Sequence, residues 1–561
     1  MQARCEMKKV FFPLGRSDFE TIRKNQYFYI DKTSLIEELY NNAGTNVYLF
    51  TRPRRFGKTL TMSMLSSFFD ISKDSHDIFD GLNISRNKEV CDKWMNKFPT
   101  VFVSFKDVDG LNYESAFDEL KNIIFNLYCG YSYLLESDKT DDAHKERFAR
   151  IYKGSPTLSD IKSSLSLLLK MLHAHYGKKV ILLIDEYDVP MAKASEKGYY
   201  PEMLDVMKGI LSVLKDSTTL EFGVVTGCLR IAKESIFTGL NNLYSNTITS
   251  TAFSEYFGFT ANEVERTFKD LGVEDKLPLA KEWYDGYLFG KSEIYSPWDV
   301  ISYLNDLKSD SDARPKNYWA NTSGNAIIGS FIQIGRKTLF DDIDALLNGE
   351  CIIKSIDENI TYDYLHSTDN NFWSILLMTG YLTVCDGAVA GVPLGEDETA
   401  LRIPNREVKS VFSKSIVNWV QTVTEEENLW SMAEALWKGD AETIAHDMTM
   451  ILNRTLSYND VWHEYVYHLF FAGLFCGIGY RVDSNKEYGM GKPDIVVLDY
   501  RRKRAAVFEL KGGKERIDDA VAQIERKKYI DGLDGYGLIM TYGVRFVGKS
   551  AEIVLKDRIE R

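Results

Sequence analysis

The hydrophobic pattern of the first 243 residues alternates between short apolar runs and longer stretches with helical spacing. The runs have the length of buried strands, and the stretches between them are long enough for crossover helices. This alternation predicts an α/β fold with a parallel sheet, because parallel strands need such crossovers. The expected strands are Val47–Phe50, Thr100–Phe105, Val180–Asp185 and Glu221–Gly227.

The pattern then changes three times, which predicts a multidomain chain. Residues 251–340 are mainly helical and suggest a helical lid. Within residues 341–420, the segment Asn371–Phe412 gives a helix, a short strand, a Gly-rich turn, the run LRIPN and another helix, an order that suits a winged-helix-like connector. Residues 421–561 return to an α/β pattern, with strands expected at Asp494–Tyr500 and Ala505–Lys511. We therefore expect domains at 1–250, 251–340, 341–420 and 421–561.

Composition narrows the class of protein. A hydrophobic fraction of 44% fits a globular chain, and the net charge of -13 excludes a global basic field for nucleic acid or anionic membrane. This acidic balance mildly favours protein partners. The seven scattered cysteines form no CxxC pair, which argues against a disulfide framework. With no signal peptide and no apolar window of about 20 residues, we expect a cytoplasmic protein without a membrane partner.

The segment Val47–Phe69 combines an apolar run, a basic loop and a helix that opens on Gly57-Lys58-Thr59. This is the order of a P-loop, in which Lys58 meets the β- and γ-phosphates and Thr59 ligates Mg²⁺. The full motif has glycine at the position of Arg52, so the match is partial. The alternative is a basic turn before a core helix. The residues expected to hold the nucleotide here are Arg54, Arg55, Phe56, Gly57, Lys58, Thr59 and Leu60.

Two carboxylates follow the apolar strand at Val180–Ile184. An ATPase needs such a pair, and we expect Asp185 to hold the Mg²⁺ shell and Glu186 to activate the attacking water. Asp188, two residues further on, is expected to be a solvated surface residue.

Three further groups are candidates for contacts with the nucleotide. Thr226 ends a later strand and is a candidate sensor of the γ-phosphate, and Arg230 follows within one turn. For both, strand-end capping or a surface ion pair is an equal alternative. The basic run Arg52–Arg55 either extends the phosphate cradle or contacts acids of a neighbouring domain.

A second set of ionisable residues lies near the C-terminus. If the two C-terminal strands form a hairpin, Asp494 joins Glu509 and Lys511 on one face, where two carboxylates hold Mg²⁺ and the lysine positions water. Glu464, in the preceding helix, is a candidate further ligand. The alternative is a surface ion pair of little energetic value. A following helix is expected to carry Gln523 and Tyr529, and Gly489–Lys492 is expected to be a flexible, basic approach.

The chain resembles the AAA-ATPase-like proteins of bacteria and archaea that carry a C-terminal nuclease-type domain. The resemblance implies that RPRRFGKT serves as the P-loop and that Asp31 and Lys32 lie near the base or ribose. The blocks that carry it are Pro13–Arg23, Phe28–Ile36, Phe50–Leu60, Leu182–Pro190, Ile236–Leu243, Trp283–Gly290, Tyr295–Val300, Leu376–Val384 and Leu401–Val408.

The motif Pro493-Asp494, Glu509-x-Lys511 and a Gln-bearing helix resembles the PD-(D/E)xK nuclease superfamily. Together the two resemblances imply a P-loop NTPase parallel sheet, a helical lid, a winged-helix-like connector and a restriction-endonuclease-like α/β domain. The expected function is an ATPase that uses ATP and Mg²⁺, coupled to a metal-dependent nuclease acting on DNA. The alternatives are a nucleotide-dependent switch and a remodelling ATPase without cleavage. A trans-acting arginine would imply a homo-oligomer, but Arg54 and Arg230 cannot be assigned that role.

Overall fold

The structure is a computed structural model, and the chain forms two compact units, Met1–Asn321 with Ile353–Glu407, and Thr322–Ile352 with Val408–Arg561. The residues that the structure describes are 9–42, 44–216, 218–230, 243–319, 342–343, 345–347, 349–360, 369–385, 394–395, 397–423, 426–455, 464–477, 479–484, 488–512 and 515–561. The block Ile236–Leu243, apart from its last residue, and the Gly-rich turn of the connector lie outside them.

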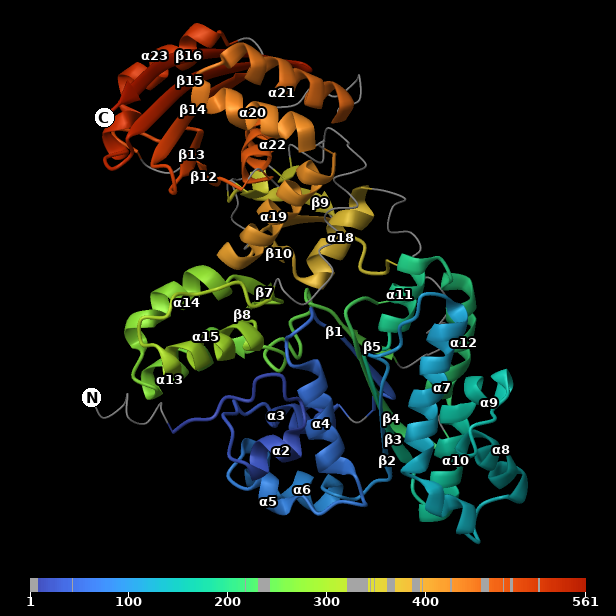
Figure 1. The fold of residues 1–561 in the computed structure, drawn as a ribbon. Helices are drawn as coiled ribbons and strands as arrows, with labels where there is room; N and C mark the ends of the chain where they lie inside the picture. Colours follow the sequence, from blue (N-terminus) through green and yellow to red (C-terminus); the bar gives the residue numbers. More distant parts are fainter. Residues whose placement is uncertain are drawn as a thin grey trace. The chain divides into compact units, whose positions relative to one another are not determined.

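The first unit is built on a five-stranded parallel sheet with the order β2-β3-β4-β1-β5 (Figure 1). The four strands expected from the sequence are confirmed, and a fifth at the edge was not predicted. Phe50 of β1 pairs with Thr226 of β4, so the two strands end together. The strands are β1 (Val47–Thr51), β2 (Thr100–Ser104), β3 (Val180–Asp185), β4 (Leu220–Gly227) and β5 (Leu243–Asn246).

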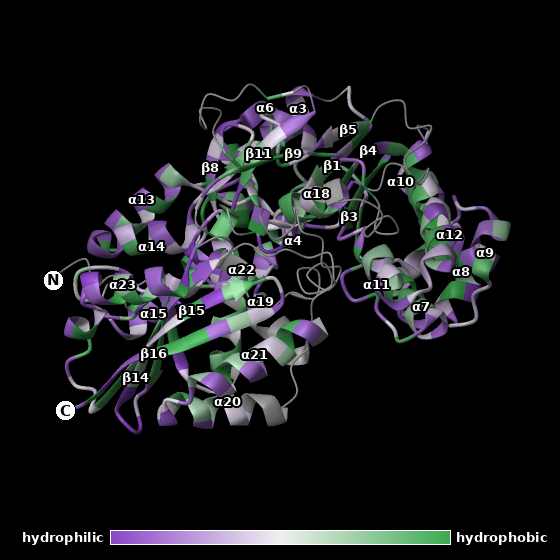
Figure 2. Cartoon of the chain, turned by 90° about the horizontal axis from the view of Figure 1, so that it is seen from above, coloured by the Kyte–Doolittle hydropathy of each residue, from purple (hydrophilic) through white to green (hydrophobic). Residues whose placement is uncertain are grey.

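Helices cover both faces of this sheet. Successive side chains of β1 point to opposite faces, and they are apolar on both, so each face needs a covering layer. Val47 and Leu49 belong to one core, whereas Tyr48 and Phe50 belong to the other. The first core is closed by α7 (Tyr113–Cys129), α8 (Asp142–Tyr152), α9 (Leu158–Lys162), α10 (Ser164–Tyr176), α11 (Val189–Lys197) and α12 (Tyr200–Leu211). The second is closed by α2 (Phe19–Lys24), α3 (Ser34–Asn41), α4 (Lys58–Phe69), α5 (His76–Phe79) and α6 (Lys88–Trp94). Figure 2 shows hydrophobic and hydrophilic residues on helices such as α7 and α12, as expected for helices with one face on a core.

The region expected to be a helical lid also contains a small antiparallel sheet. Its helices are α13 (Ala261–Asp270), α14 (Leu277–Tyr284) and α15 (Pro297–Ser309). The strands β6 (Phe259–Thr260), β7 (Tyr287–Phe289) and β8 (Ser292–Tyr295) form the order β6-β8-β7. These strands are two to four residues long, too short for the sequence pattern to reveal.

The connector contains a helix, a short strand and a second helix in the expected order. It also has two strands that were not predicted, one before the first helix and one that includes the start of LRIPN. Its elements are β9 (Ile352–Ser355), α18 (Asp369–Thr379), β10 (Thr383–Val384), β11 (Glu398–Arg402) and α19 (Arg406–Val423), with the sheet order β10-β11-β9. The expectation against disulfides is wrong here, since Cys351 and Cys385 are each disulfide-bonded. Spacing along the chain says nothing about which cysteines the fold brings together.

The C-terminal sheet has the order β12-β13-β14-β15-β16, and all neighbours are antiparallel except β14 and β15. Both strands predicted here are confirmed. The helix α23 (Ile517–Lys527) makes the crossover between the parallel pair. The other elements are α20 (Glu426–Lys438), α21 (Ala441–Thr455), α22 (Glu464–Gly477), β12 (Arg481–Ser484), β13 (Ile495–Asp499), β14 (Arg504–Gly512), β15 (Leu538–Val547) and β16 (Ser550–Glu560).

The fold class expected from the sequence is therefore confirmed as a multidomain α/β chain with a parallel N-terminal sheet and a mixed C-terminal sheet. Among the helices that the structure describes, none is both long and apolar enough to cross a membrane.

Candidate functional site

The loop between β1 and α4 contains two residues in the left-handed backbone conformation. Gly57 precedes the first residue of α4 and takes a left-handed conformation with φ of 83°. This backbone conformation strongly favours glycine. Arg55 is also left-handed, with φ of 72°, which costs a non-glycine residue about 1–2 kcal/mol. The positive end of the 12-residue helix α4 and its free amides thus face the loop.

Lys58 is buried and its ammonium group points back into the loop. Its Nζ donates to the carbonyl oxygens of Arg52 and Pro53, each at 3.0 Å, and lies 3.3 Å from Glu186 Oε1. Burial opposes the charge of Lys58, but the neighbouring Cys228 and Glu186 outweigh it and raise its pKa above the ordinary value. The lysine is therefore charged, and its ammonium group lies against the backbone of the loop.

Asp185 stands at the end of β3 and accepts three hydroxyl hydrogen bonds. Thr59 Oγ1 donates to Asp185 Oδ2 over 2.8 Å and Thr226 Oγ1 donates to Oδ1 over 2.7 Å. The third donor is Ser104 at 3.2 Å, which sequence reasoning missed although Ser104 ends β2 at the same edge of the sheet. Burial and the nearby Glu186 raise the pKa of Asp185. This oxygen-rich cluster is the donor set that Mg²⁺ prefers.

Glu186 follows Asp185 in a left-handed conformation with φ of 52°. One carboxylate oxygen pairs with Lys58, while Oε2 is buried and has no hydrogen-bond partner among the described residues. A buried carboxylate oxygen without a donor is costly, so a ligand or water donor would stabilise it. Glu186, the second acid of the predicted pair, therefore has one carboxylate oxygen that can accept a hydrogen bond from a ligand or water.

Asp188 is not the solvated surface residue expected from the sequence. It is 1% exposed, and its Oδ2 accepts the backbone N–H groups of Cys228 and Leu229 at 2.9 and 3.0 Å. A side chain at Gly227 would come within 2.6 Å of Asp188 Oδ1, so only glycine fits there. Asp188 therefore fixes the turn that follows Thr226.

The basic run 52–55 divides between two environments, and Arg52 takes neither of the two roles that the sequence left open. Arg52 is fully buried and donates to the backbone oxygens of Thr51 and Asn246 and to Asn246 Oδ1, which makes it a structural residue. Arg55 lies with Cζ 4.0 Å from the centre of the Trp298 ring, and its charge interacts with the buried acids Asp299 and Glu407.

The other residues predicted to contact the nucleotide lie in different environments around the loop. Phe56 is buried against Tyr287 and Phe289, with ring centres 5.0 Å apart in each pair. Arg54 lies close enough to interact electrostatically with the Cys228 thiol. Arg230 is half-buried, with Nε lacking a partner among the described residues.

An apolar pocket lies beside the loop and has about 520 Å³ of space, a volume that includes open solvent. Its wall includes Gly57 and Leu60 from the start of α4, and Lys32 from the segment FYIDKT. The other lining residues are Pro13, Phe28, Tyr29, Ile30, Phe56, Thr61, Tyr256, Gly258, Phe259, Pro297 and Ile301. Asp31 is absent from this wall, since its carboxylate accepts from the backbone N–H groups of Thr33 and Asn83.

The C-terminal strands form the hairpin that the second site requires. Ile495 pairs with Phe508, which places Asp494 opposite Glu509 at the end of the ladder. Glu509 Oε1 lies 3.3 Å from Lys511 Nζ, and Asp494 Oδ2 accepts from the Leu510 backbone N–H at 2.7 Å. Burial and the charge of Asp494 raise the pKa of Glu509 to about 7. A cation between the carboxylates would relieve this repulsion, so the pair suits a divalent metal.

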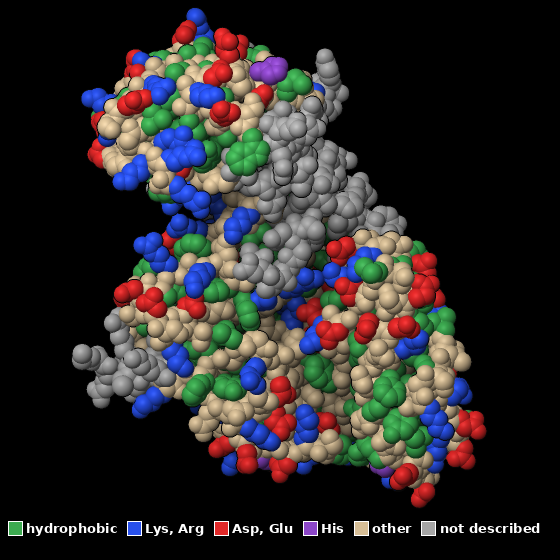
Figure 3. Space-filling model, in the orientation of Figure 1, with side chains coloured by type: hydrophobic (Ala, Val, Ile, Leu, Met, Phe, Trp, Pro, Cys, Tyr) green, Lys and Arg blue, Asp and Glu red, His purple; other side chains and the backbone are tan. Residues whose placement is uncertain are grey.

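The residues around this pair partly match expectation. Gln523 lies on α23 as predicted, but Tyr529 lies beyond the helix because Lys528 turns left-handed. The Tyr529 hydroxyl donates to Glu509 Oε2 at 3.0 Å. Glu464 begins α22, but its side chain is outside the described residues. Figure 3 shows lysine and arginine side chains gathered over the β12–β13 edge of the sheet.

Across the described part of the chain, no three His, Cys, Asp or Glu side chains come together. A cation at either site would therefore complete its shell with hydroxyl, backbone or water oxygens, as Mg²⁺ commonly does.

Comparisons with known proteins give a family match over each of the two regions that contain a candidate site. Residues 13–237 match the family model described as predicted AAA-ATPase, and residues 462–555 match that of the PD-(D/E)XK nuclease superfamily. The chain is 25% identical over 571 residues to a protein described as "Uncharacterized protein in vnfD 5'region" of Azotobacter chroococcum mcd 1, with 98% of each chain covered. The resemblance seen in the motifs is confirmed, and the chain combines an AAA-ATPase-like region with a C-terminal region like the PD-(D/E)XK nucleases.

Proposed function

We propose that the chain binds ATP with Mg²⁺ at the loop before α4 and hydrolyses it. The observation that carries this proposal is the hydrogen bond from Thr59 to Asp185, beside the buried Lys58. Thr59 and Asp185 would hold the cation, which supplies charge neutralisation for the phosphates. Lys58 would bind the phosphates, and Glu186 would accept a proton from the attacking water.

The same proposal gives the other predicted residues their roles. Arg54 and the backbone from Arg55 to Thr59 would cradle the phosphates, and Thr226 would sense the γ-phosphate through Asp185. Arg230 would contact phosphate or the adjoining region. Phe56 and Leu60 would support the loop from its apolar side, since Phe56 is buried and Leu60 lines the cavity.

The cavity beside the loop suits a purine base, and it suits adenine better than guanine. Its walls are mostly apolar, and the Nζ of Lys32 already donates to both Glu263 carboxylate oxygens and to the Glu255 carbonyl. Guanine would need acceptors for its N1 and N2 hydrogens, and each left without a partner would cost about 1–3 kcal/mol. Adenine has fewer such groups to satisfy, which favours ATP over GTP.

We propose that the C-terminal region is a metal-dependent nuclease acting on DNA. The meeting of Asp494, Glu509 and Lys511 at one end of the β13–β14 hairpin carries this proposal. The two carboxylates would hold Mg²⁺, with Glu464 as a further ligand, and Lys511 would position water against a phosphodiester. We also propose that binding and hydrolysis of ATP control cleavage through the segments 251–340 and 341–420. The proposed domains keep the boundaries expected from the sequence, and the proposed location is the cytoplasm.

Two measurements on full-length protein test the proposal. ATP hydrolysis and ATP binding are compared between wild type and Lys58→Ala, with the exposed Lys93→Ala as control. Loss of both in Lys58→Ala alone supports the P-loop assignment. ATP binding that changes protein shape with no hydrolysis and no DNA cleavage would favour a nucleotide-dependent switch. Hydrolysis without cleavage of any DNA would favour a remodelling ATPase.

A further inference from the structure

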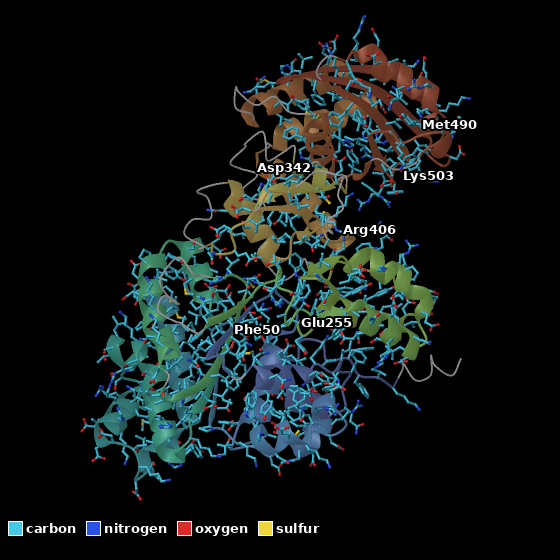
Figure 4. The ribbon with its side chains drawn as sticks, turned by 180° about the vertical axis from the view of Figure 1, so that it is seen from behind. Phe50, Glu255, Asp342, Arg406, Met490 and Lys503 are labelled. Atoms are coloured by element: carbon cyan, nitrogen blue, oxygen red, sulfur yellow. The ribbon has the colours of Figure 1, made fainter. Side chains whose placement is uncertain are left out.

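A tight turn at residues 488–491 stands immediately before the candidate metal-binding hairpin. The Tyr488 N–H donates to the Gly491 carbonyl at 2.8 Å, and the Gly491 N–H donates back to Tyr488 at 3.1 Å. Met490 at the tip is 68% exposed. Figure 4 shows Met490 at the outer edge of the C-terminal sheet.

This turn is anchored, in contrast to the flexible approach expected from its glycines. The Met490 N–H donates to the Lys527 carbonyl at 3.0 Å. Gly489 has φ of 55°, and a side chain there would come 2.0 Å from the Lys528 carbonyl oxygen. Tyr488 is 8% exposed, and its hydroxyl donates to Asp483 at 2.6 Å. The glycines thus allow close packing, and the position of Met490 is defined by its backbone.

The surroundings of the tip are basic. Lys492 and Lys528 are exposed on either side of the turn, and Arg526 is exposed on the last turn of α23. Among the described residues, Glu525, which pairs with Lys556, and Asp531 are exposed acids of the same segment. A thioether flanked by ammonium and guanidinium groups suits a ligand with both phosphates and flat apolar faces, which are the features of nucleic acid.

The turn is also directly connected to the candidate catalytic cluster. Asp494 is four positions after Met490, a distance that an extended chain spans with at most about 14 Å. The Lys492 carbonyl lies 3.4 Å from the Tyr529 hydroxyl, the same group that donates to Glu509. Since successive phosphates of a DNA strand are about 3.4 Å apart along the axis, Met490 reaches a base step within about four nucleotides of the cleaved phosphate.

We propose that Met490 is a wedge that inserts between stacked base pairs of DNA next to the scissile phosphate. Methionine is among the apolar side chains that proteins insert in this way, at a cost in stacking repaid by backbone contacts. Lys492 and Lys528 supply the contacts to phosphates on either side. This inference rests on the proposed nuclease function and adds to it a duplex substrate that is bent or opened near the cut.

The test places 2-aminopurine, whose fluorescence rises on unstacking, at successive positions of a DNA duplex. Full-length Asp494→Ala protein, and wild type in EDTA, keep the DNA intact, and anisotropy confirms binding. We expect fluorescence to rise at least twofold at one base step within about four nucleotides of the site that wild type cleaves. Met490→Ala should lose most of this rise, and Met490→Leu should retain it. Met450→Ala, an exposed methionine of α21, is the matched control.

The outcomes separate this inference from the nuclease proposal. If wild type cleaves DNA but the fluorescence stays flat, or rises equally in Met490→Ala, the wedge is overturned and the nuclease stands. If wild type neither cleaves nor binds DNA, both proposals fail together. A rise that depends on Met490 in protein that binds but does not cleave supports the wedge alone.

Discussion

Thr59 Oγ1 donates a hydrogen bond to Asp185 Oδ2 over 2.8 Å, which joins the first turn of α4 to the end of β3. The strand β4 lies between β3 and β1 in the sheet, and its last hydroxyl, on Thr226, reaches the same carboxylate. The sheet order thus brings the ends of β3 and β4 and the first turn of α4 to one carboxylate, and the proposed nucleotide site depends on that convergence.

The Thr59 hydroxyl should be needed for binding of ATP with Mg²⁺. Thr59→Val keeps the volume but removes the oxygen, so we expect affinity for ATP with Mg²⁺ to fall about tenfold or more, since a hydrogen bond to a charged group contributes about 1.5–3 kcal/mol. Calorimetric titration with and without Mg²⁺ measures this. Thr59→Ser retains the hydroxyl and should bind nearly as wild type. Equal affinities for Thr59→Val and wild type would remove Thr59 from the site.

Glu186 should act in hydrolysis rather than in binding. Glu186→Gln removes the base and also the negative charge that pairs with Lys58. We expect the turnover rate of ATP hydrolysis to fall about 10²–10⁴-fold while ATP affinity is kept or increased. Rates and dissociation constants are measured on the same preparation. The control is Glu196→Gln, which alters an exposed ion pair. A variant that turns over at the wild-type rate would exclude Glu186 as the base.

Arg52 should be essential for stability although it occupies the position of a motif glycine. Arg52→Gly restores the usual P-loop pattern, but it leaves the Asn246 oxygens without their donors and opens a cavity. We expect the free energy of unfolding to fall by about 3–5 kcal/mol. Chemical denaturation measures the change, with the exposed Arg314→Gly as control. An unchanged stability would show that the buried guanidinium has no structural role.

Asp299 should make the stability of the first unit depend on pH. Burial raises the pKa of Asp299 to about 7, with Arg55 and Glu407 as its charged neighbours. Below the unfolded pKa near 3.8 both states are protonated, and between that value and 7 the unfolded state alone ionises. The stability that protonated Asp299 contributes is therefore lost as pH rises from about 3.8 to about 7.

Asp299→Asn nearly keeps the size of the side chain and removes this titration. Its stability relative to wild type should rise between pH 5 and 7, by up to about 1.4 kcal/mol per pH unit, and level off above pH 7. Thermal unfolding across this range measures the difference, with the exposed Asp92→Asn as control. A constant difference from pH 5 to 8 would contradict the shift.

The sequence predicts those parts of the fold that local pattern determines. The strands β1 and β3 are unbroken apolar runs buried on both faces, so their positions and the acids after β3 follow from the sequence. By contrast, β5 contains Tyr244, Ser245 and Asn246 and has no such run. The strands β15 and β16 were missed as well, although β15 is mostly buried.

The residues whose environment depends on distant parts of the chain could not be predicted. Asp188 is buried because the amides of Cys228 and Leu229, 40 and 41 residues away, need an acceptor. Arg52 turns inward because Asn246, 194 residues away, offers two oxygens. Asp494 and Glu509 were placed together correctly, because a short hairpin fixes their pairing locally.

The most direct test of the account is DNA cleavage by wild type and Asp494→Ala with Mg²⁺, in the presence and absence of ATP. Plasmid, linear duplex and single-stranded DNA are each incubated with full-length protein, and Lys58→Ala reports the contribution of the nucleotide site. We predict cleavage by wild type, none by Asp494→Ala, and a dependence on ATP that Lys58→Ala abolishes. The nuclease proposal would be contradicted by equal cleavage by wild type and Asp494→Ala. It would also be contradicted if wild type cleaved none of the DNA substrates with or without ATP.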